Sequence, residues 1–226
     1  MTLYWPRRLL APRKVLPEPV YATESGGRSI TAAEQIISSD AGYWQIVLDE
    51  IPLASPDQKR VWRAISVKLE GRLNTIAVPI YDQDIAPYPT IAAGPDSNIP
   101  FSDASLFSDA TGFGQDIITA TINAAVALNA VSVPINVTQG GDLEIGMHFS
   151  VLNRLYRIKE ITSTIGTVTT VKVWPNVREA MLSGAEANFD DPRCLCRLAT
   201  DGEMQSGIDD YAGRTLARVN FVEALP

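Results

Sequence analysis

Short segments in which apolar and polar residues alternate recur along most of this chain. In residues 42–51, for example, Trp44, Ile46 and Leu48 occupy every second position. A period of two is that of a β-strand whose two faces meet different surroundings. Comparable strand-like runs occur at 74–81, 117–122, 130–137, 148–151, 155–162, 167–173, 194–199 and 215–224. We therefore expect a mainly β fold.

One segment has the period of a helix instead. Ser55 can cap its first turn, Pro56 suits the first helical position, and Gln58 can complete a capping box. Apolar residues follow this start at helical spacing, namely Val61, Trp62, Ile65 and Leu69. Gly71 comes after them and is a natural end for the helix. With the strands on either side, this helix forms a strand–helix–strand unit.

The remaining segments suggest how the chain is organised. Residues 1–41 are rich in proline and glycine, which predicts an extended N-terminal arm. Residues 42–116 with 200–226 are expected to form a helix-flanked β domain carrying a long loop at 82–116. The strand at 215–224 should return to the first sheet, because the strand–helix–strand unit has too few strands to be stable alone. The evenly spaced strands of 117–199 predict an inserted small β-barrel, with a short helical turn in 175–186.

Charge and hydropathy narrow the classes of partner. The formal net charge is −7, so the surface should repel phosphate backbones, and no specific nucleic-acid binding is expected. Four basic residues nevertheless gather near the start, either on a solvated arm or on one that reaches an acidic neighbour: Arg7, Arg8, Arg13 and Lys14.

The longest apolar stretch, 120–137, is broken by asparagines and a proline, so no membrane span is expected. Lacking an apolar run of signal-peptide length at the start, the chain should stay in the cytoplasm or leave inside a larger particle.

No residues present a catalytic motif. The one histidine, His148, begins an apolar strand and favours a structural role. The pairs Asp190-Asp191 and Asp209-Asp210 could in principle serve glycoside hydrolysis, but adjacent acids are typical of solvated turns. Neither nucleotide-binding glycine motif occurs. We therefore expect no enzyme, no cofactor, and no catalytic or metal-binding residues.

Two further features leave alternatives open. Cys194 and Cys196 would share one face of a strand, where a disulfide between them would be strained, so reduced thiols are favoured. The alternative, a CxC metal half-site, would need further ligands. The repeated Phe-Ser-Asp-Ala motif places Asp103 and Asp109 in successive turns, with a calcium or interface site as the alternative.

The four tryptophans raise the question of carbohydrate binding. Trp44 and Trp62 lie on the apolar faces of a strand and of the helix, so core packing is favoured for both. A sugar-binding surface would instead need an exposed aromatic cluster, for which Trp174 and Tyr156 are the candidates.

Several segments together resemble a family of tail-region proteins encoded by bacteriophages and prophages. The similarity covers most of the chain from about residue 40, and its motifs are structural. They are Gly42-Tyr43-Trp44, Trp62-Arg63-Ala64, residues 75–79, the two Phe-Ser-Asp repeats, residues 146–150 and 154–158, and the endings 194–199 and 219–224.

The resemblance implies a fold and a role. The strand–helix–strand unit looks like the tail-tube and distal-tail fold, in which a split-barrel sheet carries a flanking helix. It implies a virion protein, assembled in the bacterial cytoplasm, that forms a hexameric or trimeric ring at the tail tip. Its partners would be copies of itself and other tail proteins of the tube, hub and fibres. The alternative is a receptor- or carbohydrate-binding module on the tail exterior.

Overall fold

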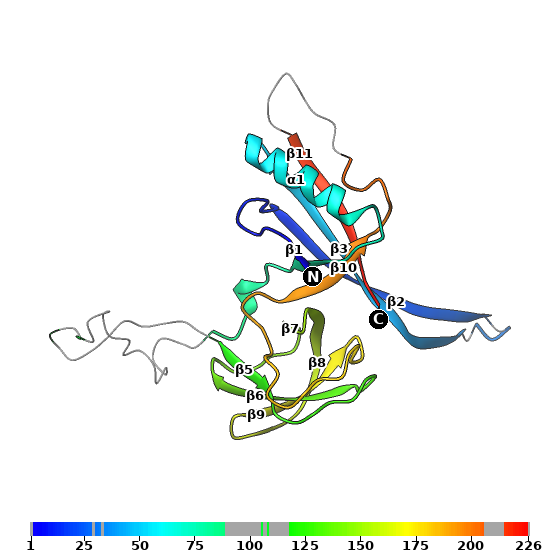
Figure 1. Ribbon diagram of the computed structural model, residues 1–226. Helices are drawn as coiled ribbons and strands as arrows, with labels where there is room; N and C mark the ends of the chain where they lie inside the picture. Colours follow the sequence, from blue (N-terminus) through cyan, green and yellow to red (C-terminus); the bar gives the residue numbers. More distant parts are fainter. Residues whose placement is uncertain are drawn as a thin grey trace. The chain divides into compact units, whose positions relative to one another are not determined.

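The computed structural model describes residues 2–28, 30–32, 34–88, 105, 108, 118–205 and 215–225. The protein is mainly β, with 51% of residues in strands and 9% in helices, and its sheets curl into half-barrels. The chain divides into two compact units. The first consists of Met1–Tyr81 with Arg193–Pro226, and the second of Asp82–Pro192 (Figure 1). The ranges expected from the sequence placed these boundaries at 116/117 and 199/200 instead.

The first unit is built on a six-stranded sheet of order β1-β4-β10-β11-β3-β2. The strands are β1 (Leu3–Tyr4), β2 (Lys14–Arg28), β3 (Glu34–Leu53), β4 (Ile76–Pro79), β10 (Arg193–Leu198) and β11 (Thr215–Glu223). Only the β1–β4 pair is parallel. The C-terminal strand β11 lies between β10 and β3, which confirms that the end of the chain returns to the N-terminal sheet.

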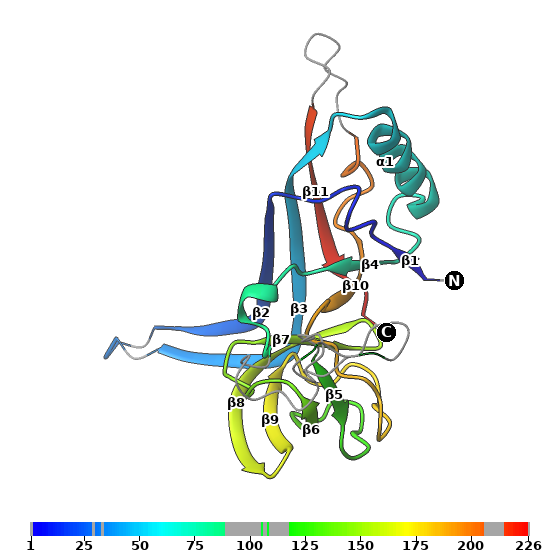
Figure 2. The ribbon, with the colours of Figure 1, turned by 90° about the vertical axis from the view of Figure 1, so that its left-hand side faces the viewer.

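The helix α1 (Pro56–Leu69) forms as its sequence predicts. Ser55 Oγ accepts from Gln58 N at 3.2 Å, and Gln58 Oε1 accepts from Ser55 N at 3.0 Å, so the capping box is complete. Trp62, Ile65 and Leu69 are buried on one side of the helix. Trp62 Nε1 also donates to the Met204 carbonyl at 3.0 Å, so the chain after β10 is tied to the helix. Figure 2 shows α1 lying to one side of its sheet.

The first residues of the chain are part of the core and not of an extended arm. Trp5 and Leu10 are buried, and Trp5 Nε1 donates to the Leu10 carbonyl at 2.9 Å. The Trp5 ring meets Trp62 and Phe221 edge-on, with centroids 6.2 and 5.8 Å away. The expectation of an extended arm over 1–41 was thus wrong for these residues. Prolines suggested a loose segment, but the large apolar side chains between them gain more from burial.

The strand at 194–199 was expected to complete the barrel, and this was wrong. It is β10, which pairs with β4 and β11 in the sheet of the first unit. The alternation of Cys194, Cys196 and Leu198 correctly identified a strand, and all three are buried. Its pairing partners are far away in sequence, so the pattern could not reveal which sheet it joins.

The second unit contains a five-stranded antiparallel sheet of order β5-β6-β9-β8-β7. Its strands are β5 (Thr119–Ile122), β6 (Ser132–Gln139), β7 (His148–Val151), β8 (Arg154–Ile165) and β9 (Val168–Trp174). Residues 181–188 bridge both outer strands, through Thr121↔Glu186 on β5 and Ser150↔Asn188 on β7. The expected helical turn in 175–186 is absent, because this segment is used as a partner for the two sheet edges.

The start of the long loop belongs to the second unit. After the 3-10 turn η1 (Gln83–Ile85), the Pro87 carbonyl accepts from Gly141 N at 2.8 Å. A Cβ at position 141 would lie 2.9 Å from the Tyr88 carbonyl oxygen, which explains a glycine there. Searching the described residues, we find no helix long and apolar enough to cross a membrane.

Candidate functional site

The β2–β3 hairpin is longer than the sheet to which it belongs. On its other side β3 pairs with β11 only between Leu53 and Gln45. The earlier part of β3 therefore pairs with β2 alone, and Figures 1 and 2 show this two-stranded ribbon continuing past the other strands of its sheet. We call residues 21–28 and 34–42 the distal arm.

An irregularity separates the distal arm from the rest of the hairpin. The register runs evenly from Lys14↔Asp49 to Val20↔Tyr43 and then jumps to Ala22↔Ser39. Two additional residues of β3 are therefore accommodated opposite Tyr21. Bulges of this kind bend a strand and increase its local twist, so the distal arm leaves the sheet at a position fixed by the sequence.

Both faces of the distal arm expose large apolar side chains. Ile36 and Ile37 are each 63% exposed. They pair across the ladder with Ser25 and Glu24, and as neighbours on a strand they point to opposite faces. A two-stranded ribbon with neither face covered is only marginally stable in water. The two isoleucines therefore leave apolar surface in water on both faces of the ribbon.

The edges of the distal arm also differ from the rest of β2. β2 is an outer strand of its sheet, and its first half contains Pro17 and Pro19. Prolines are tolerated on outer strands and discourage pairing with a further strand. Residues 21–28 contain no proline and no lysine. The distal part of β2 thus lacks the prolines that protect its first half, although it carries the charged residues Glu24 and Arg28.

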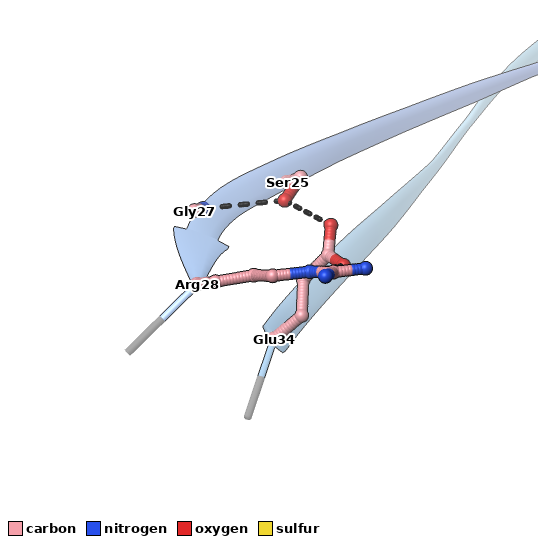
Figure 3. Close-up of polar contacts among 4 residues, drawn as sticks. All are labelled: Ser25, Gly27, Arg28 and Glu34. Carbon is pink, nitrogen blue, oxygen red and sulfur yellow. Dashed lines mark hydrogen bonds and ion pairs between the residues drawn. The ribbon is translucent and has the colours of Figure 1, made fainter. Parts of the chain in front are cut away.

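Polar contacts close the tip of the hairpin (Figure 3). Ser25 Oγ donates to Glu34 Oε1 and accepts from Gly27 N at 3.2 Å. Arg28 Nε lies 3.6 Å from Glu34 Oε2. Gly27 has a φ of +84°, which glycine adopts without strain. These contacts join the two strands and hold the ribbon together at its end.

The polar residues considered for catalysis have structural partners. The His148 side chain is buried, with Nδ1 paired to Asp82 and Nε2 accepting from Arg157 Nε at 2.8 Å. Because both ring nitrogens are engaged, the imidazole presents no lone pair to a substrate. Asp190 accepts from the Tyr88 hydroxyl, and Asp191 N donates to Asn188 Oδ1 at 2.8 Å.

The cysteines and acidic residues considered as metal ligands lie partly inside and partly outside the described residues. Cys194 and Cys196 form no disulfide bond with each other and are fully buried. In the described parts of the chain, no three His, Cys, Asp or Glu side chains are grouped so as to hold a metal ion. Asp103, Asp109, Asp209 and Asp210 lie outside the described residues.

Three of the aromatic residues considered for sugar binding are buried. Trp44 and Trp62 are buried, which confirms their expected place in the core. Tyr156 is also fully buried, and its hydroxyl accepts from Arg178 N at 3.1 Å. An exposed aromatic cluster containing Tyr156 was therefore a wrong expectation.

Sequence reasoning did not find the distal arm. The Gly26-Gly27 pair between two strand-like segments is a hairpin signal, but the nearby prolines favoured a loose arm.

No protein-family model matches the chain, and no curated protein matches it.

Proposed function

We propose that this chain is a structural component of a bacteriophage tail. In this role it forms a ring at the distal tail or tail tip and connects the tube to the tip or to the fibres. Its chemistry is that of assembly, and it acts as no enzyme.

The distal arm is the observation that carries the proposal. It exposes isoleucines on both faces and leaves both edges without a strand partner in the described chain. A monomer that functions alone gains nothing from such a ribbon, whereas a subunit of a ring can bury it against a neighbour. The ring role itself comes from the family resemblance, and the arm supplies a physical means for it.

The proposed fold is correspondingly specific. We assign the first unit to the helix-flanked split-barrel type, with α1 beside the six-stranded sheet. The second unit would be a small β-barrel inserted between β4 and β10. Support comes from the curled sheets and from residues 181–188, which bridge both edges of the second sheet.

Imaging the particle tests the proposal. Virions made by the genome that encodes this chain would be analysed by mass spectrometry and by cryo-electron microscopy. We expect the chain in the tail, in a ring near its tip, with the distal arm against a neighbouring subunit. A particle without the chain, or with the chain in the head, would overturn the proposal.

A further inference from the structure

We infer that the distal arm binds a second copy of this chain, and that it does so on the exposed arginines Arg8 and Arg13. This inference rests on the proposed ring-forming role and names the contact that would build the ring. Three observations support it: the opposite charges of the arm and the arginines, the distance between them along β2, and the exposed aliphatic side chains near both.

The distal arm is acidic. It contains Glu24, Glu34 and Asp40 and a single basic residue, Arg28, which pairs with Glu34. Glu24 is exposed and lies directly across the ladder from the exposed Ile37. One face of the arm therefore combines a carboxylate with a large aliphatic side chain.

The start of the chain offers the opposite charge. No acidic residue precedes Glu18, although the whole chain has a net charge of −7. Of the basic residues there, Lys14 pairs with Glu50. Arg8 and Arg13 are exposed, and neither forms a salt bridge to another described residue. Leu16, which is 44% exposed, follows Arg13 closely in sequence, so an exposed aliphatic side chain lies near the charge along the chain.

The arm cannot reach these arginines in its own chain. Glu24 lies about 33 Å along β2 from Lys14, the residue next to Arg13, at roughly 3.3 Å per residue. A compact domain of on the order of 100 residues has a radius of gyration of about 13 Å, which makes it roughly 34 Å across. The separation along β2 is therefore similar to the width of one such domain. A neighbour displaced by about that distance would bring its Arg8 and Arg13 to the arm.

Such a contact joins two different surfaces, the arm of one copy and the arginines of the next. Head-to-tail contacts of this kind generate rings when the rotation closes. Opposite charges would orient the two surfaces during encounter, and burial of Ile37 and Leu16 would hold them together.

A charge-exchange experiment tests the inference. One variant carries Glu24→Lys and Asp40→Lys, and the other carries Arg8→Glu and Arg13→Glu. Sedimentation velocity of each full-length chain should show self-association weakened on the order of tenfold or more, because like charges now face each other. An equimolar mixture should associate again, since each reversed arm meets a reversed acceptor. Circular dichroism spectra matching the wild type would show that both variants are folded.

The opposing outcomes are distinct. Unchanged association of either variant, a mixture that does not recover, or a wild-type chain that stays monomeric would overturn the inference. If the arginines bind another tail protein or nucleic acid instead, reversing their charge leaves self-association unchanged. Failure of the proposed function would appear separately, as absence of the chain from the tail. A chain present in a tail ring with its arm elsewhere would overturn only this inference.

Discussion

Lys14 and Glu50 form an ion pair between β2 and β3, close to where the hairpin joins the sheet. Glu50 reaches this partner from an unusual backbone conformation, with a φ of +54°. It lies beside an irregularity in the β3–β11 ladder, where the register shifts between Ala217 and Val219. Glu50 thus lies at a bulge, has a strained backbone and pairs with a residue of the edge strand β2.

Replacing Glu50 should separate strain from ion pairing. Both Glu50→Gly and Glu50→Ala remove the carboxylate, but only glycine adopts a positive φ without steric cost. We expect Glu50→Gly to be more stable than Glu50→Ala by about 1 kcal/mol, the lower end of the cost of a left-handed backbone. Urea denaturation of the two proteins measures this difference. Equal stabilities would show that residue 50 does not hold a strained conformation.

The same pair should make stability depend on alkaline pH. The hydrogen bond that Lys14 donates to Glu50, followed by the charge of Glu50, raises the pKa of Lys14 above its usual 10.5. A raised pKa in the folded state adds stability that is complete below pH 10.5 and is lost as the pH rises through the folded value. Wild-type stability should therefore fall above pH 10.5 more steeply than that of Glu50→Gln. Parallel curves for the two proteins in alkaline urea titrations would contradict this.

Gly71 should tolerate no side chain while Asp201 is present. Its φ is +64°, and a Cβ there would lie 2.6 Å from Asp201 Oδ1, which accepts from Arg72 N at 3.0 Å. We expect Gly71→Ala to lose about 2 kcal/mol or more, from the left-handed backbone and the clash together. In an Asp201→Ala background the same change should cost less, because the clashing carboxylate is gone. A double-mutant cycle of unfolding free energies with no coupling would count against this arrangement.

The exposed isoleucines of the distal arm should matter for assembly and not for folding. Ile36→Ser and Ile37→Ser remove apolar surface that the isolated chain leaves in water. Their melting temperatures should stay close to that of the wild type, while self-association weakens. Ile165→Ser is the matched control, because Ile165 is 78% exposed at the β8–β9 hairpin of the second unit. Equal loss of association in all three variants would mean that the arm has no special part.

Local sequence signals predicted the elements of this fold better than their assembly. The capping box of Ser55 and Gln58 is a contact within one helical turn, so the start of α1 could be predicted. The strand at 194–199 was also recognisable, but its partners β4 and β11 lie far away in sequence. The distal arm was missed for a related reason. In the sequence Ile36 and Ile37 resemble core residues. Only the structure shows that the pairing of β11 with β3 ends at Gln45, so that this part of β3 is not covered by β11.

Shortening the hairpin measures the role of the distal arm most directly. Val20 and Tyr43 are the last pair before the register shift, so residues 21–42 can be replaced by Asn-Gly, which favours a tight hairpin turn. The shortened chain should keep the wild-type circular dichroism spectrum and sediment as a monomer at concentrations where the full chain associates. A shortened chain that is folded and associates like the full chain would contradict assembly through the arm.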